Sequence, residues 1–317
     1  MKTNSHPANT RPPQRTAGFT LIELLIVIVI LAILMSLILP AISSAQKNAR
    51  VSAVVNEIKS LESGLANFNA KYGFYPPSTI TLHEAATGWS GDSESRALIR
   101  RMFPNFDFTA ARDLNGDGDA TDSILLNGNE CLVFFLGGLP IRDTTSGSTV
   151  FAMNGFSKNP ANPFATAGSS RIGPFTEFDT TRLVDVYAGA SAGSNGFPEY
   201  VDPLPNQTAP YGFLSANNGR GYPAGSSPYR APGEDDNLNN VLDSGEDANG
   251  NMVLDPGLPF KPETYQIVSP GFDGDYGAGG TYDPETASAK LGYDAEPSSR
   301  RGDRDNITNF HQGMLAD

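Results

Sequence analysis

The 317-residue sequence has little of several residue types on which common functional sites depend. It holds one cysteine, Cys131, which excludes a disulfide within the chain and any zinc site built from cysteines. Basic residues are also scarce, with 22 Lys and Arg against 35 Asp and Glu and a net charge of −13. A nucleic-acid coat needs a basic face, so this balance argues against nucleic acid as a partner.

Apolar residues are concentrated in one block near the amino terminus. The run from Leu24 to Ile42 is interrupted only by Ser36 and Pro40. At about 1.5 Å per residue it covers about 28 Å, close to the thickness of the hydrocarbon core of a membrane. Residues 1–18 carry basic side chains and no acidic one. The sequence therefore predicts a single-pass anchor with a cytoplasmic amino terminus and an exported remainder.

A cleaved secretory signal is the simpler alternative for this block. The apolar run is longer than a typical signal core of roughly 7–15 residues. Glu23 also places a carboxylate at the fifth position of the block, where a signal needs none, and the helical pattern continues beyond Ala45. These features favour a retained anchor.

The segment Gly18-Phe19-Thr20-Leu21-Ile22-Glu23-Leu24, followed directly by the apolar run, resembles the processing site of type IV prepilins and type II secretion pseudopilins. The resemblance implies that residues 1–18 are a leader peptide. It further implies that prepilin peptidase cleaves between Gly18 and Phe19 on the cytoplasmic face and N-methylates Phe19.

Two residues of the apolar block fit assembly into a filament. An unpaired carboxylate inside a bilayer is costly, so Glu23 needs a partner, and the new amine of Phe19 on an adjacent subunit would supply it. Pro40, which matches a proline of that family, lacks an N–H and frees the carbonyl of Ser36. We expect a weak point there, where the helix can kink or melt.

Beyond the membrane segment the pattern becomes amphipathic. Apolar residues recur at steps of three and four: Val51, Val54, Ile58, Leu61, Leu65, Phe68 and Tyr72. Such a stripe predicts one helical face that packs on the chain's own sheet. Gly73 and Pro76-Pro77 end the pattern, which predicts a helix over 19–72, with 19–42 in the membrane and 43–72 amphipathic.

The remaining residues, 73–317, are expected to form a loop-rich exported domain. Short strands are predicted over 148–153, 183–188 and 264–269, and a helix around Asn129–Leu136. The long stretches 154–175 and 189–233 are expected to be connections over the domain surface. The fold class is α+β, and the resemblance implies a pilin-like lollipop, with the long helix packed on a small antiparallel sheet and calcium-binding insertions.

A first candidate calcium loop begins at Asp113. Oxygen-bearing side chains recur at alternate positions, with Gly118 at position 6, as at the front of an EF-type loop. The candidate ligands are Asp113, Asn115, Asp117 and Asp119. Position 12 is Ile124, so Asp122 or a distant group must complete the shell.

A second candidate is a tandem repeat with a 12-residue period, in which 233–245 aligns with 245–257. Random acidity would not keep such a period, and the units resemble calcium-binding Asp/Asn repeats of extracellular proteins. The first unit has the fuller shell, because Leu258 takes position 12 of the second. The candidate ligands are Asp235, Asn237, Asn239, the Val241 carbonyl, Asp243 and Glu246, then Asp247, Asn249, Asn251 and Asp255.

A third candidate lies near the carboxyl terminus. The stretch 265–277 resembles the final hairpin of the type II secretion major pseudopilin, whose loop binds calcium. On that resemblance the ligands are Asp273, Asp303 and Asp305, although an insertion separates Gly277 from Asp303 and leaves Asp275 or Asp283 as substitutes.

Three function classes follow. The first is a structural subunit of the periplasmic pseudopilus of a type II secretion system, held in the inner membrane. Its partners would be membrane lipid, like subunits, prepilin peptidase and an inner-membrane assembly platform. The second is a major or minor pilin of a surface type IV pilus. The third is a membrane-anchored calcium-binding enzyme, which the residues disfavour because the Gly-x-Ser-x-Gly pattern around Ser191 is not followed by a helix. The chain is expected not to be an enzyme.

Overall fold

The computed structural model describes residues 19–145, 149–186, 194–223, 225–226, 228–231, 233–234, 242–255, 257–283 and 302–316. The chain divides into two compact units, residues 1–49 and 50–317, and the boundary falls inside the first helix. The first unit contributes only helix among its described residues, and the second holds every strand.

The first helix, α1, runs from Leu21 to Tyr72 without a break and continues through Pro40. The predicted helix is therefore confirmed, with its start two residues later than expected. In the first unit its side chains are exposed, and an 18-residue window there has a mean hydropathy of 3.2 with no part of it buried. This is the one helix in the described part of the chain that is long and apolar enough to cross a membrane.

The second unit adds short helices and strands. The helices are α2 (Ala86–Gly91), α3 (Ser93–Met102), α4 (Gly128–Gly137) and the 3-10 turn η1 (Thr180–Arg182). The strands are β1 (Ile80–His83), β2 (Ser123–Leu126), β3 (Pro140–Asp143), β4 (Val150–Met153), β5 (Phe156–Ser157), β6 (Arg171–Ile172), β7 (Leu183–Val184), β8 (Glu199–Tyr200), β9 (Gly212–Ser215), β10 (Tyr265–Ser269) and β11 (Ile307–Thr308).

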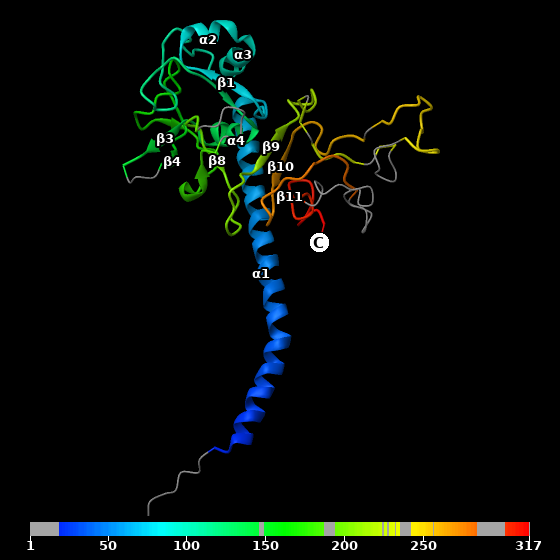
Figure 1. Cartoon of the computed structure of the whole chain (residues 1–317). Helices are drawn as coiled ribbons and strands as arrows, with labels where there is room; N and C mark the ends of the chain where they lie inside the picture. The colour runs from blue at the N-terminus through cyan, green and yellow to red at the C-terminus, as the bar shows by residue number, and fades with distance from the viewer. Residues whose placement is uncertain are drawn as a thin grey trace, which may run out of the picture. The chain divides into compact units, whose positions relative to one another are not determined.

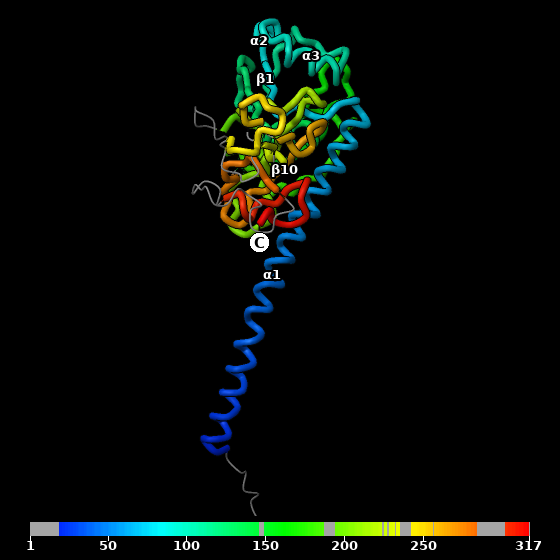
Figure 2. The backbone as a smooth tube through the Cα atoms, turned by 90° about the vertical axis from the view of Figure 1, so that its right-hand side faces the viewer, coloured from blue at the N-terminus to red at the C-terminus, as the bar shows by residue number. Residues whose placement is uncertain are grey.

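All pairs between these strands are antiparallel. The largest sheet has the order β11-β10-β9, and the other pairs are β1–β2, β3–β4, β5–β6 and β7–β8. Figures 1 and 2 both show α2 and α3 at one end of the second unit and the carboxyl-terminal segment toward the other. The long helix and the small sheets make the fold α+β, as predicted.

Strand predictions were accurate where the apolar residues stand together. β10 and α4 lie within one residue of their predicted bounds, and β4 occupies the described part of 148–153. The strand predicted over 183–188 is shorter, since β7 ends at Val184. The reading of 189–233 as surface connection was wrong for β9, whose Phe213 and Ser215 are buried in the main sheet. Its four residues are too few to stand out among flanking Gly, Asn and Pro.

The core forms around the amphipathic part of α1. The predicted stripe is confirmed, because Val54, Ile58, Leu61, Leu65 and Phe68 are at most 2% exposed. Aromatic rings surround it. Phe68 meets Phe74, Phe135 and Phe175 at centroid distances of 5.5, 5.7 and 5.6 Å, all edge to face. Cys131 is fully buried in α4, and burial raises the pKa of its thiol, as suits a small core residue.

One ionic network joins α1 to the rest of the second unit. The Glu57 carboxylate accepts hydrogen bonds from Arg182, with Nη1 at 2.7 Å, and from the hydroxyls of Tyr200 and Tyr211, both at 2.8 Å. Arg182 Nη2 also donates to Glu57, and the guanidinium lies 4.5 Å from the centre of the Tyr200 ring. A half-buried carboxylate is thus matched by one charge and two hydroxyl donors, which is how such a group is tolerated beside a core.

Gly64 should be necessary on the buried face of α1. A Cβ there would lie 1.9 Å from Thr176 Oγ1 and 3.3 Å from the Phe175 carbonyl oxygen. Gly64→Ala should lower the free energy of unfolding by about 1–3 kcal/mol through overpacking. Alanine's better helix propensity, about 1 kcal/mol, should be outweighed. Thermal melts of the full chain in detergent would measure this.

The matched control is Gly91→Ala, because a methyl group at Gly91 meets no atom within 4 Å. Adding Thr176→Ala to Gly64→Ala should recover much of the lost stability. Equal midpoints for the Gly64 and Gly91 variants would contradict the packing explanation.

Candidate functional site

The predicted processing and assembly residues lie at the start of α1. Gly18 falls outside the described residues, and Phe19 is 85% exposed. Glu23 Oε2 accepts hydrogen bonds from the Thr20 backbone N–H at 2.9 Å and the Thr20 hydroxyl at 2.8 Å. Glu23 therefore caps the first turn of its own helix through Thr20.

The loop that begins at Asp113 has the backbone of an EF-type turn. Asp113 Oδ1 and Oδ2 accept from the N–H groups of Gly116 and Gly118 at 2.6 and 3.0 Å. Asn115 Oδ1 then accepts from the Asp117 N–H, and Asp117 Oδ1 from the Asp119 N–H. Gly116 and Gly118 have φ values of +77° and +100°, at positions 4 and 6 of the loop. The alternate side chains thus turn to the inside of one tight loop.

The second repeat unit, far along the chain, repeats this arrangement. Asp247 accepts from the N–H groups of Asn251 and Met252 at 3.0 and 2.9 Å, and positions 3 and 5 accept from the N–H groups two residues on. Gly250 and Met252 have φ values of +73° and +58°, again at positions 4 and 6. A positive φ is uncommon for methionine. The loop therefore keeps its conformation at Met252 against the backbone preference of that residue.

The side chains of the second repeat unit, 247–255, converge on Asp255. The amide groups of Asn249 and Asn251 both donate to Asp255 Oδ2. Glu234 lies outside the repeat's ligand pattern, and its carboxylate accepts from the N–H groups of Ala248, Asn249 and Asp255. Leu258, at position 12 of this repeat unit, has no oxygen-bearing side chain. The Glu234 carboxylate instead holds the loop backbone through these three N–H groups.

The first repeat unit is only partly covered. Asp235, Asn237, Asn239 and Val241 lie outside the described residues. Asp243 and Glu246 are described, and the Asp243 N–H donates to Glu246 Oε2 at 2.8 Å.

Glu84 is a residue that sequence reasoning missed at the first loop. Ligand atoms of Glu84, Asp119 and Asp122 lie within 4.8 Å of one another. Glu84 is fully buried and accepts from the N–H groups of Leu114 and Asp122 at 2.6 and 3.1 Å. Burial raises the pKa of this carboxyl. Of the four predicted ligands Asp119 belongs to this group. The oxygens of all four, Asp113, Asn115, Asp117 and Asp119, also accept from N–H groups of the loop's own backbone. The distance of 30 residues between Glu84 and Leu114 hides the partnership from a local pattern.

The carboxyl-terminal candidates lie together across the insertion. Asp305 accepts from the Asp273 N–H at 3.1 Å, and Asp273 Oδ1 accepts from the Asp275 N–H at 2.9 Å. Asp303 is fully buried and accepts from the Gly279 N–H at 2.9 Å and the Tyr229 hydroxyl at 2.5 Å. Hydrogen bonds therefore hold the segments 273–279 and 303–305 together.

Asn306 adds an unusual acceptor beside Asp303. Its amide nitrogen donates to the Tyr229 hydroxyl and to the Tyr276 carbonyl, at 2.8 and 2.9 Å. Its Oδ1 is buried without a hydrogen-bond partner. A buried oxygen in that state is costly, and a donor or a cation would satisfy it.

A Ser–His–Asp contact that no sequence motif predicted occurs in the second unit. His83 Nδ1 lies 2.7 Å from Ser123 Oγ, and Nε2 lies 3.2 Å from Asp92 Oδ2. The fold accounts for both contacts, because His83 faces Ser123 in the β1–β2 register and Asp92 is the N-cap of α3. The contact ties α3 to β1. Ser191, the other serine considered, lies outside the described residues.

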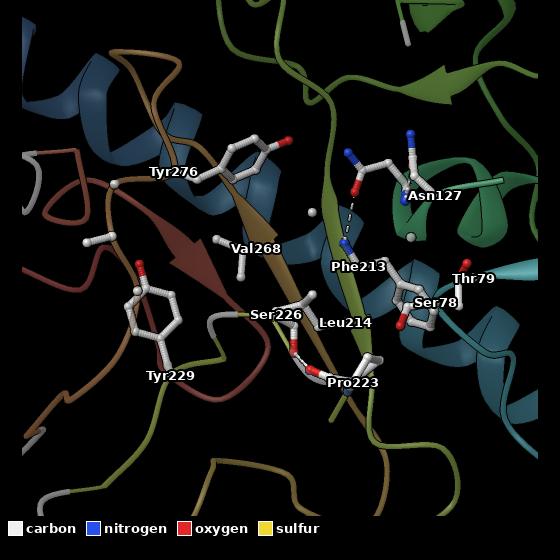
Figure 3. A pocket seen from close by; sticks show the side chains of 17 residues that line it. Ser78, Thr79, Asn127, Phe213, Leu214, Pro223, Ser226, Tyr229, Val268 and Tyr276 are labelled. Carbon is white, nitrogen blue, oxygen red and sulfur yellow. Dashed lines mark hydrogen bonds between the residues drawn. The ribbon is translucent and has the colours of Figure 1, made fainter. Parts of the chain in front are cut away.

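A cavity of about 540 Å³ is lined by residues of β9, β10 and the start of α4. Figure 3 shows the side chains that line it. The Phe213 N–H on its wall donates to Asn129 Oδ1 at 3.2 Å. Among the described residues that line it there is no His, Cys, Asp, Glu, Lys or Arg. The lining offers apolar contacts, amides and hydroxyls, and so it holds no acid–base pair of the kind that hydrolysis uses.

Two buried carboxylates meet at the start of α4. Glu130 and Asn127 form a capping box, and Glu130 Oε1 accepts from the Asn195 amide at 2.7 Å. The Asn127 amide donates to Glu199 at 3.1 Å. Burial, with smaller contributions from Glu199 and Asp185, raises the pKa of Glu130 from 4.5 to about 7, and burial also raises that of Glu199.

These shifts predict how stability depends on pH. Between pH 4.5 and about 7 the folded protein holds a proton on Glu130 that the unfolded chain has released. The free energy of unfolding should therefore fall as pH rises through this range. Glu130→Gln should flatten the profile in part, because Glu199 still titrates, whereas Glu177→Gln at an exposed position should not. Urea unfolding of the full chain across this range tests it, and an equal slope in wild type and Glu130→Gln would contradict it.

Comparison with known proteins gives one match. Residues 13–39 match the prokaryotic N-terminal methylation motif. No curated protein and no solved structure matches the chain. The motif covers the predicted cleavage site and α1 as far as Leu39, including Phe19 and Glu23. Together with the long exposed apolar helix, it supports a type IV pilin-like protein.

Proposed function

We propose that this chain is a structural subunit of the periplasmic pseudopilus of a type II secretion system, anchored in the inner membrane before assembly. The observation that carries the proposal is the methylation motif at 13–39 followed by a helix whose apolar side chains are exposed throughout its first half. Side chains of this kind need lipid or the helices of other subunits around them. A filament core built from such helices supplies that environment once the subunit leaves the membrane.

The start of α1 supplies the chemistry of assembly. After cleavage before Phe19, the new amine is a cation within a few residues of Glu23. The Thr20 contacts hold Glu23 at the first turn, so its carboxylate is positioned when the subunit docks. Pairing between Glu23 of one subunit and the amine of the next removes two uncompensated charges from an apolar surrounding. Prepilin peptidase and an inner-membrane assembly platform are the partners that this route requires.

Processing is the first test. The mature chain isolated from membranes should begin at N-methylated Phe19, which mass spectrometry of the amino-terminal peptide would show. Glu23→Gln should still be cleaved but should enter filaments poorly, because a neutral side chain no longer attracts the amine. A matched control is Glu62→Gln, which removes a carboxylate in the second unit. A mature chain that begins at Met1 or Gln46 would overturn the filament proposal.

Loss of the chain in its own cells separates the pseudopilus from a surface pilus. The proposal expects that secreted enzymes accumulate in the periplasm and that surface filaments are unchanged. Loss of surface filaments with normal secretion would instead indicate a pilin of a type IV pilus. The carboxyl-terminal closure of Asp273, Asp303 and Asp305 supports the first outcome, because it follows the pattern of the major pseudopilin.

We further propose that the acidic loops bind calcium as a structural ion. The donor set suits a hard cation, since carboxylate and amide oxygens predominate in all three loops. Asp113, Asn115, Asp117 and Asp119 would hold it in the first loop, with Glu84 and Asp122 within reach. Asp247, Asn249, Asn251 and Asp255 would hold it in the second. In the third, the orphaned oxygen of Asn306 lies next to Asp303 and fits a cation better than an empty space. Bound calcium would order long loops that bury little apolar surface.

Calcium should therefore raise the thermal midpoint of the full chain in detergent, since it binds the folded state only. Asp113→Ala combined with Asp247→Ala should reduce that increase by removing the first ligand of two loops. Asp143→Ala, at an exposed aspartate of β3 outside the loops, is the control and should leave it unchanged. A midpoint that is the same in calcium and in chelator would refute the metal proposal.

A further inference from the structure

Arginines on and beside α3 stack on phenylalanine rings, at one end of the second unit (Figures 1 and 2). Arg96 and Arg100, one helical turn apart on α3, share one ring. Their guanidinium carbons lie 4.9 and 5.3 Å from the centre of Phe108. Arg101 and Arg112 stack on other rings, at 4.2 and 4.5 Å.

Arg101 and Arg112 are engaged by the fold, whereas Arg96 and Arg100 are not. Arg101 Nη2 donates to a backbone carbonyl at 2.8 Å. Arg112 donates to Asn162 Oδ1 at 2.9 Å and to two backbone carbonyls. Among the residues that the structure describes, the guanidinium groups of Arg96 and Arg100 have no hydrogen-bond or ion-pair partner. Their N–H donors are therefore available to a group outside the fold.

The carboxylates nearest in sequence do not neutralise this arginine pair. Asp92 is the N-cap of α3 and accepts from the Ser95 N–H at 3.0 Å. Asp107 accepts from the N–H and the hydroxyl two residues on, at 2.9 and 2.6 Å. Glu94 is two residues from Arg96, and side chains on a helix meet when they are three or four residues apart.

The arginine pair is arranged to bind carboxylates. Phe108 is only 7% exposed, so the ring that both guanidinium groups contact is fixed in the core. Contact with a fixed ring restricts two long side chains, and less entropy is then lost when an anion binds. Two like charges four residues apart on a helix also repel each other, and a bound negative charge relieves that repulsion.

A segment of another protein fits this pair better than a membrane surface or a second copy of the chain. Basic clusters that bind anionic lipid contain about four to eight Lys and Arg, whereas two arginines are available here. The net charge of −13 also opposes the approach of the chain to an anionic membrane. A second copy is a poor source of carboxylates, because those of its described acidic loops, such as Asp113 and Asp247, already accept from their own backbone.

We infer that Arg96 and Arg100 form a docking site for an acidic segment of another protein, with one carboxylate on each guanidinium. An extended segment with Asp or Glu at alternate positions places its carboxylates about 7 Å apart on one face. Residues four apart on a helix are separated by about 6 Å along the axis, so the two spacings match. Each arginine would bind its carboxylate through paired N–H groups. The inference goes beyond the proposed filament function and does not depend on it.

Peptide binding to the full chain in phosphatidylcholine nanodiscs tests the site. A fluorescent peptide of alternating Glu and Ser should bind, and the same peptide with Gln in place of Glu should not, as measured by fluorescence anisotropy. Arg96→Gln with Arg100→Gln should weaken binding of the acidic peptide by about tenfold. A calcium-free buffer prevents the peptide from binding through a metal ion in the acidic loops.

Matched variants separate the arginine pair from net charge. Arg142→Gln with Lys158→Gln removes the same charge at exposed positions elsewhere and should leave the affinity unchanged. Arg96→Lys with Arg100→Lys keeps the charge but loses the planar guanidinium, so its affinity should lie between those of the wild type and the glutamine variant. The lysine variant also covers the case that the glutamine variant folds poorly.

Equal binding of the acidic peptide to the wild type and the glutamine variant would overturn the inference, as would equal binding of the Glu and Gln peptides. Vesicles of phosphatidylglycerol, tested by co-sedimentation with the nanodiscs, represent the lipid alternative. If they bind the wild type but not the glutamine variant, and the acidic peptide binds neither, the ligand is a lipid surface and the inference is wrong. None of these outcomes bears on the processing of Phe19, so the filament function is tested separately.

Discussion

The fold depends on the removal of one helical face from water. The stripe from Val54 to Phe68 belongs to the main hydrophobic core of the second unit, together with residues of α4, the β9–β11 sheet and the aromatic cluster around Phe68. Hydrophobic burial at this face gives the surrounding short elements a common support, since none of the two-stranded sheets would be stable alone. The Glu57 network makes this packing specific, because its ionic and hydroxyl contacts fix which side of α1 faces the rest of the second unit.

Local patterns in the sequence predicted the parts of the fold that local forces determine. The recurrence of apolar residues at steps of three and four predicted the amphipathic part of α1 and its buried face. The apolar run after Asn127 predicted α4. Strand β9 and the His83–Ser123 contact were missed, because each depends on partners distant in the chain. A four-residue strand has no periodicity of its own to detect. Phe213 becomes a core residue only when β10 pairs with it, across more than fifty residues.

The same division applies to the candidate sites. Spacing alone predicted the acidic loops, and the structure shows that loops at 113–121 and 247–255 share one backbone conformation, including positive φ at positions 4 and 6. What spacing could not predict are the supporting groups. Glu84, Glu234 and Asn306 come from outside the repeats, and each is placed by tertiary structure. The acidic residues alone therefore understate the candidate sites, whereas the fold shows which other groups support the loops.

The unbroken course of α1 also has a mechanical consequence. Because α1 is one unbroken helix from Leu21 to Tyr72, tension applied at its start is carried by the chain into the residues of the buried stripe. Glu57 belongs to the same segment and binds Arg182 and two tyrosine hydroxyls within the second unit. The apolar contacts of the stripe and the polar contacts of Glu57 therefore resist such a pull together.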